Sequence, residues 1–240
     1  MTGKEIADMA RGIEGWLFEA ETVLLYELAR KADPKGVIVE IGSWKGKSTV
    51  CMAKGAEAGT GAKIYAIDPH IGSEEHHVGG QKVWTFDQFK ANIKRMGVED
   101  RIVPIVKTSV AAAKDFDQPV SLIFIDGAHD FDSVKEDFLT WYPKVIEGGV
   151  IAFHDCSWCE GPRRYVREAL FRNPNIRDAK FVRSIAYGTK TANQTAGQAF
   201  GNRTRLLVKY LHDPSLTLAT SQPVKRVLFP LLGKPVNKPS

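Results

Sequence analysis

The chain has 240 residues, of which 43% are hydrophobic, 25% charged and 10% aromatic, a composition typical of one globular domain with short extensions. This composition excludes the disordered, collagen-like and fibrous classes. No apolar run reaches the ~18–20 residues that cross a bilayer, and the N-terminus lacks the apolar core of a signal peptide. Three cysteines are too few for a disulfide framework. We therefore expect a cytoplasmic protein.

The net charge of +5 is unevenly distributed. Residues 156–240 contain 15 Lys and Arg against 4 Asp and Glu, whereas residues 1–155 contain 18 against 24. A basic C-terminal third suits phosphates, an acidic substrate or an anionic membrane, and equally a solvated surface or a self-association face.

The N-terminal residues 1–35 are predicted to be a helical extension. Apolar residues recur at three- and four-residue steps from Lys4 to about Lys31, and Gly12 and Gly15 are expected to split this pattern into two helices. The following Asp-Pro-Lys-Gly turn ends the second helix, because proline cannot extend it.

Residues 36–215 are predicted to form a single α/β domain. Its first part contains five expected strands, at residues 37–41, 63–68, 102–106, 120–125 and 150–153. Expected helices lie between them, over residues 47–58, 86–96 and 133–141. Most of these strands are continuously apolar, which is typical of a parallel sheet covered by helices on both faces.

The rest of the domain is expected to complete the sheet. A helix is predicted over 163–171, with strands near 180–186 and 205–210 and a long loop over 188–201 between them. The predicted fold is therefore α/β, a doubly wound, mostly parallel, Rossmann-like seven-stranded sheet with an N-terminal helical extension. The last residues, 216–240, form a basic apolar tail that contacts a membrane surface, contacts a partner subunit or packs on its own domain.

Ligands of an open α/β sheet bind beyond the carboxyl ends of its strands. The first strand leads into Gly42 and Gly46, which allow backbone amides to approach a ligand at a helix N-terminus. Their spacing matches neither the G-x-G-x-x-G pattern nor the Walker phosphate loop, and a simple tight connection would also use such glycines. The second strand ends at Asp68, whose carboxylate can accept both hydroxyls of a ribose. Together these features indicate a nucleoside-containing cofactor.

Four motifs carry a resemblance to a known family: VIVEIGSWKGKST, IYAIDPH, LIFIDGAHDFDSVKEDF and GGVIAFHD. In this order they resemble the class I S-adenosylmethionine-dependent methyltransferases, and more narrowly the branch that contains the macrocin and mycinamicin sugar O-methyltransferases and the cephalosporin-hydroxylase-like proteins. The resemblance covers residues 15–155. It implies a set of residues that bind S-adenosylmethionine: Glu40, Gly42, Ser43 and Gly46 along its methionine and ribose part, Asp68 at the ribose hydroxyls, Ser109 near the adenine, and Asp126.

The resemblance also implies a reaction centre. The sulfonium is already electrophilic, so the enzyme must orient an acceptor and help to remove its proton. In the resembling O-methyltransferases the Asp of D-G-x-H and an acidic pair after the next strand hold Mg²⁺, and the His is the proposed general base. Asp126 and His129 are therefore the expected catalytic residues, and Asp126, His154 and Asp155 the expected metal ligands.

His154 departs from the acidic pair of that pattern. Imidazole is a poor ligand for Mg²⁺ but suits Zn²⁺, Mn²⁺ or Fe²⁺. Three alternatives stay open: Mg²⁺ held by Asp126 and Asp155 with waters, another divalent cation, or no metal. The adjacent C-x-x-C of Cys156 and Cys159 adds a zinc or redox pair as a further interpretation, against two reduced loop thiols.

The acceptor side is less defined. The loop 69–83, which contains His76 and His77, is a candidate mobile segment over the site, and its histidines are candidate metal ligands or solvated side chains. Trp16, Phe18 and Glu21 of the N-terminal helices are candidates for a lid.

The function that we expect is methyl transfer, assisted by a divalent metal, to a hydroxyl of a small-molecule acceptor of sugar or natural-product type, and a homo-oligomer is a candidate assembly. The alternatives are methylation of nucleic acid, motivated by the basic C-terminal third, and a cofactor-binding partner protein without methyl transfer. No RNA-binding module or interleaving of aromatic and basic residues supports the nucleic-acid alternative.

Overall fold

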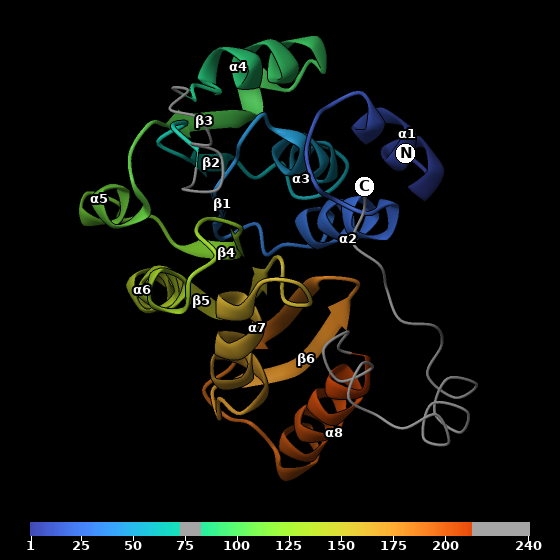
Figure 1. Cartoon of the computed structure of the whole chain (residues 1–240), viewed down its shortest axis with the longest axis vertical. Coiled ribbons are helices and arrows are strands. Elements are labelled where there is room, and N and C mark those ends of the chain that lie inside the picture. Colours follow the sequence, from blue (N-terminus) through green and yellow to red (C-terminus); the bar gives the residue numbers. More distant parts are fainter. Residues whose placement is uncertain (73–82, 213–240) are drawn as a thin grey trace.

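The computed structural model describes residues 1–72 and 83–212 (Figure 1). The strands of these residues are β1 (Val37–Ile41), β2 (Ile64–Ile67), β3 (Ile102–Ile105), β4 (Val120–Ile125), β5 (Val145–Phe153), β6 (Ile176–Val182) and β7 (Ile185–Lys190). They form one seven-stranded sheet in the order β3-β2-β1-β4-β5-β7-β6. The pairs among β1 to β5 are parallel, and β7 is antiparallel to both β5 and β6. The predicted doubly wound, mostly parallel, seven-stranded sheet is thus confirmed.

Helices cover both faces of this sheet (Figure 1). The helices on one face are α1 (Gly3–Arg11), α2 (Glu19–Arg30), α3 (Lys47–Glu57) and α4 (Phe86–Arg95). The helices on the other face are α5 (Ser109–Lys114), α6 (Phe131–Trp141), α7 (Glu160–Val166) with its π-helical continuation (Arg167–Phe171), and α8 (Ala196–His212). Short 3₁₀ turns at Glu99–Arg101 and Tyr142–Lys144 precede β3 and β5.

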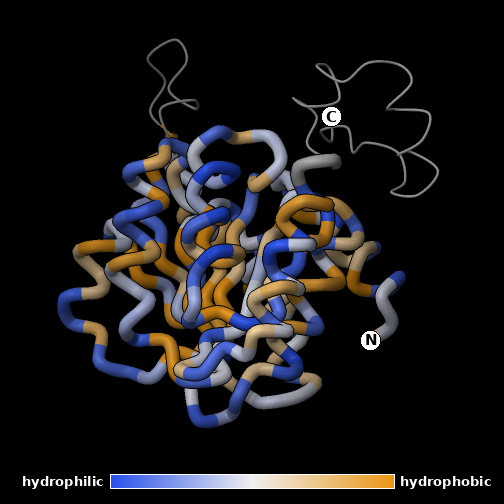
Figure 2. Tube along the Cα trace, turned by 90° about the horizontal axis from the view of Figure 1, so that it is seen from below, coloured by the Kyte–Doolittle hydropathy of each residue, from blue (hydrophilic) through white to orange (hydrophobic). Residues whose placement is uncertain are grey.

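Successive strand residues point to opposite faces, and each face has its own core. Leu122 and Phe124 of β4 pack with α1 to α4, whereas Ile123 and Ile125 pack with α5 to α8. All six residues of β4 are buried, which explains why its sequence is continuously apolar rather than alternating. Along the helical coils, orange and blue stretches alternate in Figure 2, as expected for helices with one face on the sheet and one in solvent.

The N-terminal extension consists of two helices, as the glycines predict. Thr2 and Glu5 form a capping box at the start of α1, and Arg11 ends it before Gly12. Gly15 has φ +152°, and its carbonyl accepts a hydrogen bond from Lys47 Nζ at 2.7 Å. The segment between the two helices is therefore hydrogen-bonded to Lys47, the first residue of α3.

The predicted strand at 205–210 is wrong, and so is the long loop over 188–201. The structure has an antiparallel β6–β7 hairpin followed by α8. The Leu-Leu-Val run suggested a strand, but the buried residues Asn202, Leu206 and Lys209 follow a helical spacing, and Leu207 is 60% exposed. Asn202 also joins α8 to the hairpin, because its side chain accepts from Ala179 N and donates to Ile176 O.

Other boundaries differ less. β5 begins at Val145, five residues before the predicted strand, and Gly148 (φ +79°) lies within it. Helix α5 was not predicted, since six residues show too little periodicity. His76, His77 and the basic tail 216–240 lie outside the described residues. None of the described helices is both long enough and apolar enough to span a bilayer.

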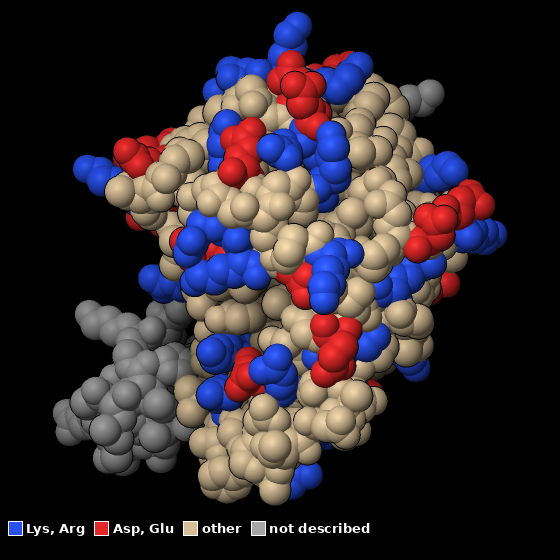
Figure 3. All heavy atoms as spheres, turned by 180° about the vertical axis from the view of Figure 1, so that it is seen from behind, with Lys and Arg blue, Asp and Glu red and all other residues tan. Residues whose placement is uncertain are grey.

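Charges on the described surface are mixed in sign. On the face seen in Figure 3, Lys and Arg side chains lie among Asp and Glu side chains. Elsewhere on the described surface, oppositely charged side chains pair within single helices, as Arg164 does with Glu160 and Lys54 with Glu57. The basic excess of the C-terminal third therefore does not form a patch of a single sign on this face.

Candidate active site

The carboxyl ends of β1, β2, β4 and β5 open into one cavity of about 630 Å³. This volume lies within the ~300–1,000 Å³ of typical small-molecule sites. Eight of the predicted site residues line it: Gly42, Ser43, Asp68, Ser109, Asp126, His129, His154 and Asp155. Glu40 and Gly46 are not among its lining residues, and they support its wall from behind.

The loop after β1 depends on its two glycines. Gly42 has φ +83°, and a Cβ there would overlap the carbonyl oxygen of Asp126 at the end of β4. Gly46 has φ +89° at the N-cap of α3 and donates its N–H to the carbonyl of Ser43 at 2.7 Å. Ser43 is 1% exposed, and its hydroxyl has no hydrogen-bond partner among the described residues. A buried hydroxyl that lines a cavity in this way is suited to a polar group of a bound ligand.

Glu40 is fully buried behind this loop. The hydroxyls of Ser48 and Thr49 donate to its two carboxylate oxygens. Burial, with smaller contributions from the charges of Asp126 and Asp68, raises the pKa of Glu40 to about 8 against the effect of these hydroxyls. The carboxyl is therefore mostly protonated at neutral pH in the ligand-free chain.

The carboxylate of Asp68 is held in one orientation by backbone amides. Its Oδ2 accepts from Trp44 N at 2.7 Å and its Oδ1 accepts from His70 N at 2.6 Å. Trp44 and His70 both have positive φ, an uncommon conformation for residues other than glycine. Each carboxylate oxygen keeps further acceptor capacity, so two neighbouring hydroxyls, as in a ribose, match this arrangement.

Ser109 is the first residue of α5 and lies on the cavity wall. Its Oγ accepts from Trp141 Nε1 at 2.8 Å and donates to Asp137. Burial raises the pKa of Asp137 to about 6, although the Ser109 hydroxyl opposes this effect. Sequence reasoning missed Asp137. The available signal was its position on the apolar stripe of α6, between Val134 and Trp141.

Two histidines and two aspartates meet where β4 and β5 end. His154 Nδ1 lies 3.0 Å from Asp126 Oδ1 and 3.5 Å from Asp155 Oδ2, and His129 Nε2 lies 3.1 Å from Asp155 Oδ2. The His154 side chain is only 3% exposed, whereas those of Asp126, His129 and Asp155 are 16–24% exposed. Asp155 has φ +54°, which turns its side chain into the cavity edge directly after the strand.

The charges in this cluster are strongly coupled. Burial raises the pKa of Asp126, against the opposing charge of His154. Burial also disfavours a charged His154, but the charge of Asp126 and hydrogen bonds to Asp126, Asp155 and Glu21 outweigh it and hold the pKa of His154 well above its usual range. The pKa of Asp155 is lowered despite burial, because His129 and His154 are hydrogen-bonded to it.

Glu21 of α2 is the buried carboxylate behind this cluster, and it is 0% exposed. Its Oε1 accepts from both the N–H and the hydroxyl of Ser184 at 2.7 Å, and its Oε2 accepts from Phe18 N at 2.8 Å. Glu21 Oε2 also lies 3.5 Å from His154 Nε2. The imidazole of His154 is therefore flanked by Asp126 on one side and Glu21 on the other.

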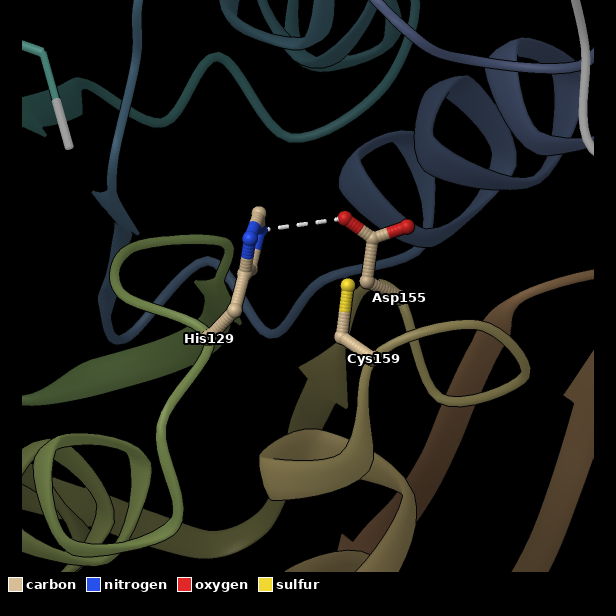
Figure 4. A group of neighbouring side chains, drawn as sticks. All are labelled: His129, Asp155 and Cys159. Carbon is tan, nitrogen blue, oxygen red and sulfur yellow. Dashed lines mark ion pairs between the residues drawn. The ribbon is translucent and has the colours of Figure 1, made fainter. Parts of the chain in front are cut away.

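The two thiols of the C-x-x-C motif lie in different surroundings. Cys156 is fully buried, its Sγ donates to the carbonyls of Phe153 and His154, and burial raises its pKa to about 12. Cys159 lies at the cavity with His129 and Asp155, and its sulfur points toward the same space as their side chains (Figure 4). Of the two cysteines, only Cys159 therefore belongs to the site.

Three comparisons relate this arrangement to known proteins. Residues 39–156 match the family model of a methyltransferase domain. A protein of Sinorhizobium fredii, y4gI, is 32% identical over 120 residues, which cover 49% of this chain and 13% of that protein. A protein of Acanthamoeba polyphaga mimivirus is 31% identical over 121 residues, which cover 49% of this chain and 50% of that protein. The chain thus matches half or less of the length of these relatives.

Solved structures share the fold over most of the chain. The O-methyltransferase TomG from Streptomyces achromogenes, in complex with SAM, has a TM-score of 0.57 at 15% identity and covers 79% of this chain and 89% of its own. An O-methyltransferase from Bacillus cereus, in complex with SAH, has a TM-score of 0.55 at 19% identity and covers 78% of this chain and 90% of its own. The family match shows a methyltransferase domain over residues 39–156, which contain β1 to β5, and the described chain has the fold of these S-adenosylmethionine-dependent O-methyltransferases.

Proposed function

We propose that this methyltransferase transfers the methyl group of S-adenosylmethionine to a hydroxyl oxygen of a small molecule, of sugar or natural-product type, in the cytoplasm. The proposal rests on one observation above all: the His129–Asp155 pair lies in the same cavity as the glycine loop and Asp68. Two of the three cysteines are fully buried and all three are free, which is consistent with a reducing compartment.

The cofactor has a consistent set of partners in this chain. Asp68 would accept the ribose hydroxyls, Ser43 and the loop at Gly42 would face the methionine part, and Ser109 would lie near the adenine. Glu40 would support this loop from behind rather than touch the solvent-accessible cavity. The fixed orientation of Asp68 and the unsatisfied hydroxyl of Ser43 favour this assignment.

His129 is the proposed base. With its Nε2–H donated to Asp155 Oδ2, the basic lone pair of the neutral ring is on Nδ1. His129 would accept the hydroxyl proton of the acceptor at Nδ1 as the oxygen attacks the methyl carbon. Asp155 would fix the tautomer of His129 and stabilise the imidazolium that forms. General-base catalysis typically accelerates a reaction by ~10²–10⁴.

Asp126, His154 and Asp155 would hold a divalent cation. Ligand atoms around a cation at about 2.1 Å are ~3.0–3.4 Å apart in octahedral or tetrahedral geometry, and two of the separations here are 3.0 and 3.5 Å. One imidazole and two carboxylates fit Mn²⁺, Fe²⁺ or Zn²⁺ better than Mg²⁺. Glu21, beside the other ring nitrogen of His154, occupies the place of the carboxylate that commonly supports a metal-binding histidine. Such a cation, when bound, lowers the pKa of a hydroxyl that it ligates.

The decisive experiment separates binding from turnover. Methyl transfer from S-adenosylmethionine is measured against a panel of sugar and phenolic acceptors, and S-adenosylhomocysteine binding is measured by calorimetry. His129→Ala should lower kcat by about 10²-fold or more while the affinity for S-adenosylhomocysteine persists. Asp68→Ala should weaken that affinity instead. Equal turnover in His129→Ala would remove His129 as the base, and unchanged affinity in Asp68→Ala would contradict the ribose assignment.

Methylation of nucleic acid has less support. It was motivated by the basic C-terminal third, whose tail lies outside the described residues, and the face in Figure 3 has mixed charges. A steep decrease of nucleic-acid affinity with salt concentration would restore this alternative.

A further inference from the structure

We propose that His129, Asp155 and Cys159 form a second, thiophilic cation site, selective for Zn²⁺, and that an ion in this site blocks His129 as a base. The cation-binding half of this proposal is independent of the proposed function. The inhibitory half rests on it.

The three side chains converge from separate segments of the chain. His129 follows β4, Asp155 follows β5, and Cys159 precedes α7 (Figure 4). His129 Nε2 lies 3.1 Å from Asp155 Oδ2, and the three ligand atoms all lie within 4.8 Å of one another. Small rotations of these three side chains would therefore bring all three donor atoms to an ion placed between them.

The chemistry of the three donors selects the ion. Imidazole, carboxylate and thiolate are all common ligands of Zn²⁺, and thiolate is a poor partner for Mg²⁺ or Ca²⁺. All three side chains line the cavity and are partly exposed, so an ion can reach them from solvent. Three protein ligands leave one position of a tetrahedral ion open to the cavity, as in catalytic and inhibitory zinc sites rather than closed structural ones.

Cys159 is the thiol that makes this site distinct. Cys51 and Cys156, the other two cysteines of the chain, are 0% exposed and pack within the two cores. Cys156, three residues earlier in the same loop, has its sulfur occupied by backbone carbonyls. A thiophilic ion that enters the cavity therefore meets one accessible sulfur, and this sulfur is next to His129.

This site shares Asp155 with the set formed by Asp126, His154 and Asp155, but the two sets do not merge into one group of ligand atoms. The two sets therefore offer two adjacent positions for an ion: an inner one at Asp126, His154 and Asp155, and an outer one at His129, Asp155 and Cys159. The inner set offers no sulfur, whereas the outer set does. Zn²⁺ should therefore prefer the outer site, because Cys159 supplies a sulfur ligand there. An ion in the outer site competes with an ion in the inner site for the Asp155 carboxylate.

Occupation of the outer site changes the protonation pattern of His129. Zn²⁺ would take the lone pair of His129 Nε2, so the single ring proton that Nε2 donates to Asp155 would move by solvent exchange to Nδ1. A neutral imidazole bound through Nε2 carries its remaining proton on Nδ1. The nitrogen that would accept the proton of the methyl acceptor is then already protonated, so the zinc-bound protein lacks its base.

Cobalt absorption provides a direct test, because a thiolate bound to Co²⁺ gives a charge-transfer band in the near ultraviolet. CoCl₂ is titrated into the full-length chain without cofactor or acceptor, and ZnCl₂ affinity is measured by competition with a chromogenic chelator. The wild type should show the band, and Cys159→Ser should lose it and bind Zn²⁺ at least about tenfold more weakly. His129→Ala should also weaken Zn²⁺ binding. Cys51→Ala is the matched control, since it removes a buried thiol outside the site and should keep both signals.

Several outcomes overturn the proposal. The proposal is wrong if the band persists in Cys159→Ser, or if wild type and Cys159→Ser bind Zn²⁺ equally well. It is also wrong if Cys51→Ala loses the band. Thermal unfolding is used to verify that each variant is folded. If a variant does not fold, His129→Ala and the wild-type band still decide the ligand set. The inhibitory half is refuted if methyl transfer by the wild type is unaffected when the outer site is saturated with Zn²⁺. Failure to methylate any acceptor leaves the binding result intact, so the two proposals fail separately.

Discussion

Replacing Glu40 with Gln should remove a loss of stability that the wild type undergoes as the pH rises. The difference in the free energy of unfolding between variant and wild type should therefore grow with pH, in favour of the variant. The carboxyl titrates near 4.5 in an unfolded chain and near 8 in its buried position. The folded state therefore binds the proton more tightly, and the wild type loses stability as the pH rises through this window. With ~1.36 kcal/mol for each pH unit between the two pKa values, the full effect is about 5 kcal/mol, of which about 3 to 4 kcal/mol falls between pH 5 and pH 8.

The assay is chemical denaturation of the cofactor-free protein at pH 5, 6.5 and 8. Gln keeps the shape of Glu40 and, like the protonated carboxyl, offers one donor and one acceptor to the hydroxyls of Ser48 and Thr49, but the change from oxygen to nitrogen adds an offset of about 1 kcal/mol. The test is therefore the slope and not the absolute stability. Glu99→Gln, on an exposed 3₁₀ turn, is the control and should run parallel to the wild type. Parallel curves for Glu40→Gln and wild type would refute the burial argument.

Two further substitutions test the walls of the cavity. Asp137→Asn should raise the free energy of unfolding by up to about 3 kcal/mol above pH 6 and have little effect below pH 4. The reason is that burial raises the pKa of Asp137 from 3.8 to about 6, so the wild type loses stability as this carboxyl ionises. Denaturation curves of variant and wild type that do not diverge with pH would contradict this. Gly42→Ala should lower the melting temperature far more than Gly97→Ala. Both glycines have positive φ, which costs about 1–2 kcal/mol for alanine. Only the Cβ at residue 42 would overlap a backbone atom, the carbonyl oxygen of Asp126. Equal shifts of the melting temperature in the two variants would show that the loop after β1 moves without cost.

The central sheet could be predicted from the sequence because each buried parallel strand is a short apolar run between glycine, proline and charged turns. Val37–Ile41 and Val120–Ile125 were predicted to the residue. The C-terminal part was harder, because Arg205–Tyr210 has the β-branched and leucine content of a strand, while its burial follows a helix that packs on β6. Tertiary packing decides between the two, and no local pattern contains that information.

The site was predictable where it follows the strand ends. Eight predicted residues line one cavity, since parallel strands bring their carboxyl ends to one edge. The position of Glu40 behind the cavity wall could not be inferred, because the direction of a side chain near the end of a strand depends on what packs against it. The split between Cys156 and Cys159 was equally hidden, because a single turn sends one thiol into the core and the other to the cavity.

Glu21 shows how the N-terminal extension contributes to the candidate site. A carboxylate with no exposed surface is costly unless its oxygens are satisfied, and Glu21 accepts three hydrogen bonds from Phe18 and Ser184. These bonds join α2 to the β6–β7 hairpin at the point where both meet His154, 3.5 Å from the Glu21 carboxylate. His154 therefore lies against two elements that flank the parallel part of the sheet, and this histidine, which departs from the acidic pair of the resembling O-methyltransferases, has a buried carboxylate beside it.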